Sequence, residues 1–181
     1  MIELTPATQA EVDALFEMEV ASYPADEAAS RDGISMRIRE AGEYFFVAHE
    51  AESSEGGVAE GTETKTKTTR RPIVGFVNGT KTSSSRLTHE SMSTHDADGS
   101  LLCIHSVVVS GKRRREGIGR RMLTDYCDII RGAQGTNGVR EIRLLCKENL
   151  IAFYAGASFE MVGVSDVVHG ADVWHEMRLL V

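Results

Sequence analysis

The sequence predicts one α/β domain built on a mixed sheet. A long apolar stretch, Leu101–Val109, contains neither Pro nor Gly and includes consecutive valines, which is typical of a buried strand. Directly after it, apolar residues recur with helical spacing from Ile118 to Ile130. Strand and helix patterns continue through the rest of the 181 residues without an internal repeat or a linker in the second half. A single domain with a sizeable core is therefore expected.

Start signals predict helices at four places along the chain. Thr8 and Glu11 form a capping box before a helix over about 8–22, and Asp26 is a candidate cap for a second helix that runs to about Glu40. A third helix begins near Gly117, and Asn149 is the candidate N-cap of a short fourth one.

Strands are expected on both sides of the apolar stretch, where β-branched and aromatic residues concentrate. These segments are Ile2–Leu4, Tyr44–His49, Ile73–Thr82, Arg140–Cys146, Phe159–Val167 and Val173–Leu180. The last two segments form a closing pair, joined through His169–Asp172.

Residues 50–71 differ from their surroundings in composition. This segment is rich in Glu, Gly, Ser and Thr and has almost no large apolar residue, so burial cannot offset the entropy cost of ordering it. We expect a flexible surface insertion between two strands. A functional lid or a modification site is the alternative.

Composition narrows the function classes. The net charge of −7 argues against nucleic-acid binding. No run approaches the roughly 18 apolar residues that span a bilayer, and the N-terminus lacks a signal-peptide pattern. The three cysteines are an odd number without metal-ligand spacing. We expect a reduced, cytoplasmic protein that acts as a monomer and binds neither membrane nor nucleic acid.

The turn between the central strand and the third helix predicts an anion site. Gly117 and Gly119 let the backbone approach a ligand, and the first N–H groups of a helix are unpaired and favour negative charge. The basic run Lys112–Arg115 adds positive charge there, so phosphate is the expected ligand. Alternatively, the glycines only open a tight turn beside a solvated charge run.

Two motifs carry a family resemblance. Arg114–Gly119 matches the Gln/Arg-x-x-Gly-x-Gly/Ala signature of the GCN5-related N-acetyltransferase (GNAT) superfamily, whose loop holds the pyrophosphate of acetyl-coenzyme A (acetyl-CoA). The stretches Leu87–Ser91 and Leu102–Val107, with His95 between them, resemble the serotonin (arylalkylamine) N-acetyltransferases, especially their fungal and protist members. The resemblance runs from about Ile73 to the C-terminus. It implies a mostly antiparallel, twisted sheet of about six to seven strands with about four flanking helices, and acetyl-CoA as the co-substrate.

The resemblance also implies cofactor contacts. A strand whose ladder opens locally would present the Val107 backbone N–H to the thioester oxygen, with Val109 on the pantetheine arm. The full set implied is Val107, Val108, Val109, Arg114, Arg115, Glu116, Gly117, Ile118, Gly119, Arg120, Asn149 and Tyr154.

The resemblance implies His105 as general base and Tyr154 as general acid. Imidazole titrates near physiological pH, so His105 can take the ammonium proton of the amine. In the resembling enzymes two histidines on this strand relay the proton, and the outer one aligns with Cys103, so His89, His95 or water completes the path. A covalent route through Cys103 is an alternative. Tyr154 would protonate the coenzyme A thiolate.

The acceptor site is less defined in the sequence. The match to Leu-Thr-x-Glu-Ser implies that Glu90 helps to shape the amine site, although a turn-stabilising carboxylate is the alternative. By analogy, Tyr23, Pro24 and Met36 line the pocket. His89, Glu90 and His95 do not have the spacing of a helical metal motif, so no metal is expected.

An arylalkylamine is the first expectation for the acceptor, because of the resemblance. Polyamines come second, since fungal relatives of this type acetylate them, and a protein N-terminus comes third. A non-catalytic acyl-CoA-binding module is the alternative of another class, because Cys103 replaces a relay histidine.

Overall fold

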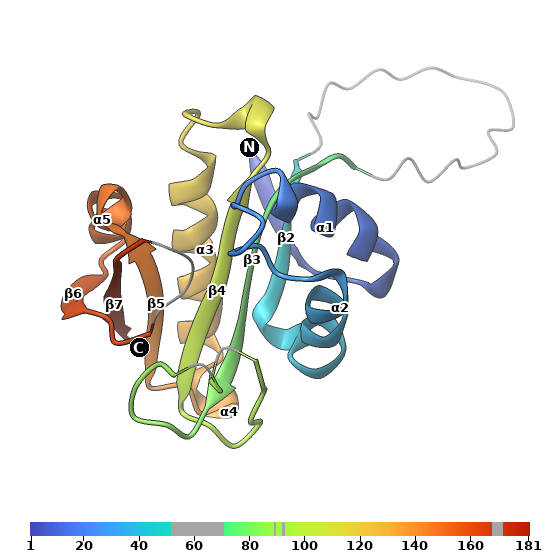
Figure 1. Cartoon of the computed structure of the whole chain (residues 1–181). Coiled ribbons are helices and arrows are strands. Elements are labelled where there is room, and N and C mark those ends of the chain that lie inside the picture. The colour runs from blue at the N-terminus through green and yellow to red at the C-terminus, as the bar shows by residue number, and fades with distance from the viewer. Residues whose placement is uncertain (52–70, 89, 92, 168–171) are drawn as a thin grey trace, which may run out of the picture.

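In the computed structural model, a seven-stranded sheet runs through the protein in the order β1-β2-β3-β4-β5-β7-β6 (Figure 1). The structure describes residues 1–51, 71–88, 90–91, 93–167 and 172–181. The strands are β1 (Ile2–Pro6), β2 (Phe45–Glu50), β3 (Ile73–Thr82), β4 (Leu101–Val109), β5 (Glu141–Lys147), β6 (Glu160–Val164) and β7 (Trp174–Leu180). Neighbours pair antiparallel except β4 and β5, which are parallel. The predicted mixed, mostly antiparallel sheet is confirmed.

Helices cover both faces of this sheet. They are α1 (Val12–Val20), α2 (Arg31–Glu40), α3 (Ile118–Gly132), α4 (Gln134–Asn137) and α5 (Ile151–Ala155). Helix α4, which has only four residues, is the one without a sequence prediction. None of the helices in the described ranges is long and apolar enough to cross a membrane.

Two hydrophobic clusters hold the layers together. On one face, Leu15 of α1 and Ile34 of α2 pack against Phe45 of β2, and all three are fully buried. On the other face, α3 packs Met122 and Tyr126 onto the sheet. Strand β2 contributes alternate side chains of Phe45–Ala48 to both clusters, so these four residues are all apolar rather than alternating. The central strands are therefore covered on both sides.

The helix predicted over about 8–22 is a 3₁₀ turn, Gln9–Glu11, followed by α1, and the central strands follow their sequence predictions. The Glu11 carboxylate accepts hydrogen bonds from the Thr8 backbone N–H at 2.8 Å and the Thr8 hydroxyl at 2.7 Å, so the predicted capping box is formed. Strands β3 and β4 have the predicted bounds, and α3 begins at Ile118 as expected.

Two predicted helix caps are wrong. Helix α2 is capped by Ser30 rather than Asp26, because the Ser30 hydroxyl oxygen accepts the Gly33 N–H at 3.0 Å. Asn149 lies within a 3₁₀ turn, Glu148–Leu150, and α5 follows with Leu150 as its N-cap and no side-chain hydrogen bond. A short turn precedes each helix, at 24–28 before α2 and at Glu148–Leu150 before α5, so each helix begins a few residues later than predicted. The expected insertion at 50–71 falls on 52–70, outside the described residues, as do His89 and most of the link at 169–172.

Candidate active site

A β-bulge in the centre of the sheet creates the site. Asn78 of β3 pairs with Ser106 of β4, and the next residue, Gly79, pairs with Ile104. His105 is thus an extra residue on β4 with no partner across the strand pair. The extra residue shifts the alternation of side chains along β4. Even-numbered residues such as Ile104 face the α3 side before the bulge, and odd-numbered residues such as Val107 face it afterwards.

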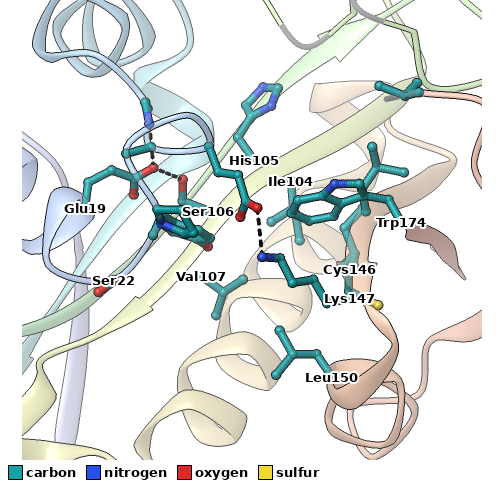
Figure 2. Close-up of a pocket in the computed structure, with 18 of the residues that line it drawn as sticks. Glu19, Ser22, Ile104, His105, Ser106, Val107, Cys146, Lys147, Leu150 and Trp174 are labelled. Carbon is teal, nitrogen blue, oxygen red and sulfur yellow. Dashed lines mark hydrogen bonds and ion pairs between the residues drawn. The ribbon is translucent and has the colours of Figure 1, made fainter. Parts of the chain in front are cut away.

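Strands β4 and β5 separate just beyond this bulge. Their last pair within the described chain is Ile104 with Leu144, although β4 continues to Val109 and β5 to Lys147. A cavity of about 410 Å³ lies at this point (Figure 2). It is lined mainly by Glu19, Ser22, Tyr23, Pro24, Glu27, Arg37, Ile104–Val107, Leu144–Lys147, Leu150, Tyr154, Val167 and Trp174.

His105 is held by a hydrogen-bond chain from β3. Its Nε2 lies 2.7 Å from the Thr80 hydroxyl oxygen, and that hydroxyl donates to the Ser91 carbonyl oxygen at 3.2 Å. Since a hydroxyl has one hydrogen, and we assign it to the Ser91 bond, Thr80 accepts from a protonated Nε2. The lone pair is then on Nδ1, which is buried and has no hydrogen-bond partner among the described residues. Burial, aided by Arg37, lowers the pKa of His105 well below its ordinary value of 6.5, so the imidazole is neutral.

Tyr154 enters the same cavity from α5. Its ring contacts Phe153 and Phe159 edge-on, with centroid distances of 5.0 and 6.1 Å, and only 7% of the residue is exposed. Burial raises the pKa of Tyr154 well above its ordinary value, with smaller contributions from Tyr23 and Cys146. The phenol therefore keeps its proton at neutral pH.

Glu19 is a site residue to which sequence reasoning assigned no role. It is 2% exposed, and its Oε1 accepts hydrogen bonds from the Ala29 N–H at 3.0 Å and the Ser106 hydroxyl at 3.1 Å. Its Oε2 is buried without a hydrogen-bond partner in the described part of the chain. Burial raises the pKa of Glu19, and nearby Arg37 opposes this rise. The sequence could have indicated this role, because Glu19 follows Leu15 and Phe16 at helical spacing and so places a carboxylate on the apolar face of the first helix.

The Val107 backbone forms a hydrogen bond with the phenol of Tyr23, which partly opposes the rise in the pKa of Tyr23 caused by burial. Tyr23 and Pro24 line the cavity as the analogy implies, whereas Met36 is not among the residues that line it.

The loop before α3 has the geometry of an anion site. Gly117 is the N-cap and adopts a left-handed conformation with φ of 79°. A Cβ on Gly119 would lie 3.3 Å from Val109, so a side chain there would crowd the strand. Arg114 is anchored, with Nε 3.2 Å from the Val109 carbonyl and Nη2 3.0 Å from the Ser22 hydroxyl. The first N–H groups of a helix and the anchored Arg114 fit a pyrophosphate.

The remaining loop residues are exposed around this N-terminus. Arg115, Glu116 and Arg120 are all at the surface, and Glu116 accepts a hydrogen bond from Arg113 at 2.9 Å. Ile118 is buried, and Val108 packs with the α1 and α2 cluster. Their cofactor contacts stay predictions.

The structure does not bring every candidate residue to the cavity. Glu90 is exposed on a turn where its carbonyl oxygen accepts the Ser93 and Thr94 N–H groups, and it is not among the described lining residues. Asn149 is also exposed and outside that lining. The Nδ1 atom of His95 accepts a hydrogen bond from the Lys81 backbone N–H at 3.2 Å, and His95 is not among the described residues that line the cavity.

Cys103 is buried in a small cluster with Leu87 and Leu101. Burial raises the pKa of its thiol to about 12, so the reactive thiolate is scarce at neutral pH. A covalent route through Cys103 therefore has no structural support. The other cysteines, Cys127 and Cys146, are free and buried as well.

Known proteins with solved structures share the fold of nearly the whole chain. No family model matches the sequence. The chain is 30% identical over 106 residues to the serotonin N-acetyltransferase of Homo sapiens, a match that covers 59% of this chain and half of that enzyme's length. The loading GNATL domain of CurA from Lyngbya majuscula matches 99% of this chain and 98% of its own, with a TM-score of 0.74 at 10% identity. Rv2747 from Mycobacterium tuberculosis, solved with CoA, matches 99% of both chains with a TM-score of 0.60 at 14% identity.

Proposed function

Because the chain has the fold of the GCN5-related N-acetyltransferases, we propose that it transfers the acetyl group of acetyl-CoA to a primary amine in a ternary complex. The observation that carries this proposal is the separation of β4 from β5 at the His105 bulge. The cavity at that separation is lined by His105, Val107 and Tyr154 together with residues of α1, α2 and their connection.

The described residues fit acetyl-CoA. The N-terminus of α3 and Arg114 would hold the pyrophosphate, and the gap between β4 and β5 would take the pantetheine arm. Acetyl-CoA supplies the activated acetyl group as a thioester.

The residues of this chain then have separate tasks. The Val107 N–H is a donor for negative charge that develops on the carbonyl oxygen, a task for which it must exchange its contact with Tyr23. His105 takes the amine proton at Nδ1, and Tyr154 gives its phenolic proton to the departing sulfur. Both side chains are in the protonation state that their task requires at neutral pH.

An arylalkylamine is the acceptor that we propose. The Glu19 carboxylate offers an ammonium group an oxygen that has no hydrogen-bond partner in the described part of the chain, and Tyr23 lines the cavity with an aromatic ring that suits an aromatic tail. The 30% identity to a serotonin N-acetyltransferase also supports this choice.

Thiol release from acetyl-CoA tests the proposed function. We expect release with tryptamine and 2-phenylethylamine, measured with a thiol-reactive dye, and no release without an amine. A panel with spermidine and a short peptide ranks the other acceptors. Tight acetyl-CoA binding without release for any amine would contradict the proposal and favour an acyl-CoA-binding module.

Glu19→Gln tests the acceptor site. The substitution keeps the shape of the side chain but removes the charge, so we expect the KM for tryptamine to rise roughly 10- to 100-fold, as for a lost charged hydrogen bond. The Kd of acetyl-CoA should not change, because the Glu19 side chain is hydrogen-bonded to Ala29 and Ser106 and not to the α3 loop. Glu17→Gln, at an exposed position of the same helix, is the matched control. An unchanged KM in Glu19→Gln would assign this carboxylate a purely structural role.

A further inference from the structure

Lys147, the last residue of β5, places its ammonium group inside the cavity between β4 and β5 (Figure 2). Its Nζ lies 2.8 Å from Glu27 Oε1 and 2.7 Å from Asp172 Oδ2. The same Nζ lies 5.6 Å from the centroid of the Trp174 ring. Three elements of the fold therefore converge on one ammonium group: the α1–α2 connection, the end of β5 and the start of β7.

This arrangement has the groups that recognise an alkylammonium ion. Carboxylates supply charge-assisted acceptors, and an indole face attracts a cation through its quadrupole. The Glu27 side chain is only 4% exposed, so its charge requires a partner there. Hydrogen bonds with Asp172 and Glu27 raise the pKa of Lys147, which keeps this group charged.

The two carboxylates that line the cavity differ in availability. Glu27 is already paired with Lys147, whereas Glu19 keeps Oε2 without a hydrogen-bond partner among the described residues. Glu27 is thus taken by a cation of the protein itself, and Glu19 is the carboxylate that we assign to the incoming ammonium. The second cation of the cavity, Arg37, donates to Asn78 at 3.3 Å on the Glu19 side.

We propose that Lys147 fills a second ammonium subsite made by Glu27, Asp172 and Trp174, and thereby selects monoamines with an uncharged tail over diamines and polyamines. This inference rests on the proposed function and names the substrate class within it. A second substrate ammonium would meet the like charge of Lys147, or would have to displace a tethered competitor of high effective concentration. An aromatic tail meets neither obstacle.

Lys147→Met tests the selectivity directly. The measured quantity is the ratio of kcat/KM for 2-phenylethylamine to kcat/KM for putrescine, which is independent of the folded fraction of each variant. We expect wild type to favour 2-phenylethylamine, and the ratio to fall roughly tenfold or more in Lys147→Met because the subsite is open. Lys147→Arg, which keeps a cation in the subsite, should retain the wild-type preference.

A second substitution assigns the effect to the subsite. Adding Glu27→Gln to Lys147→Met should restore the preference for the monoamine, since the open subsite then lacks its buried charge. Calorimetric titration of putrescine into wild type and Lys147→Met tests the subsite without turnover, so its result stands even if no amine releases thiol. Binding gained in Lys147→Met supports the inference. A wild-type preference for putrescine, an unchanged ratio or no gain in binding would overturn it.

Discussion

We expect His105→Gln to lower kcat by about 10²- to 10⁴-fold, the usual contribution of a positioned general base. Glutamine occupies a similar volume and can still accept from or donate to Thr80, but its amide does not take a proton from an ammonium group. The Kd of acetyl-CoA should stay near the wild-type value, because the α3 loop is not altered. Rapid-quench measurement of a single turnover separates this effect from product release. Wild-type turnover in His105→Gln would mean that another group, such as the Glu19 carboxylate, removes the proton.

The Thr80 contact allows a finer test of the same base. Thr80→Val removes the hydroxyl that accepts from Nε2, so the imidazole loses its fixed tautomer and a buried N–H loses its partner. We expect kcat to fall in Thr80→Val and to recover in Thr80→Ser, with the tautomer followed by ¹⁵N spectra of the histidine rings. Equal losses in both variants would point to packing instead.

The pH dependence of wild type follows from the same burial. A base whose pKa is lowered is in its active, unprotonated form over a wider pH range, and it loses activity only when the pH falls through the lowered value. At saturating substrates, kcat should therefore stay constant as the pH falls to 6.5 and decline only below it. A decline centred above pH 6.5 would contradict this environment for His105.

Tyr154→Phe is expected to lower kcat by about 10²-fold or more while acetyl-CoA binds with nearly unchanged Kd. The substitution removes only the hydroxyl, and the edge contacts of the ring with Phe153 and Phe159 remain. The departing thiolate must then be protonated by water, which is not held in position as the phenol is. Turnover is measured by thiol release and affinity by calorimetry.

Tyr44→Phe is the matched control for this substitution. Tyr44 is also buried, but it lies outside the cavity lining, beside His95 and Lys81. Both kcat and Kd should be unaffected in that variant. A large loss of acetyl-CoA affinity in Tyr154→Phe with unchanged turnover would refute the acid role and make Tyr154 a binding residue.

Local sequence patterns were sufficient to predict the main secondary-structure elements of this protein. The valine-rich run of β4, the helical spacing after Gly117 and the glycines of the α3 loop are properties of neighbouring residues, so they predict a strand, a helix and an anion site without knowledge of the rest. The family motif likewise singled out His105 and Tyr154, which the structure places on one cavity. The helix starts at Asp26 and Asn149 were wrong because short turns decide such boundaries.

The working details of the cavity depend on partners far apart in the chain. The bulge at His105 is a mismatch between β3 and β4, which no single strand records, and the Thr80 contact that orients the imidazole follows from it. Glu19 has a role only because α1 buries it beside Ser106, 87 residues away. Lys147 meets Glu27 across 120 residues. Pairings over such separations are set by packing of the whole domain, so tertiary structure alone decided which charges the acceptor would meet.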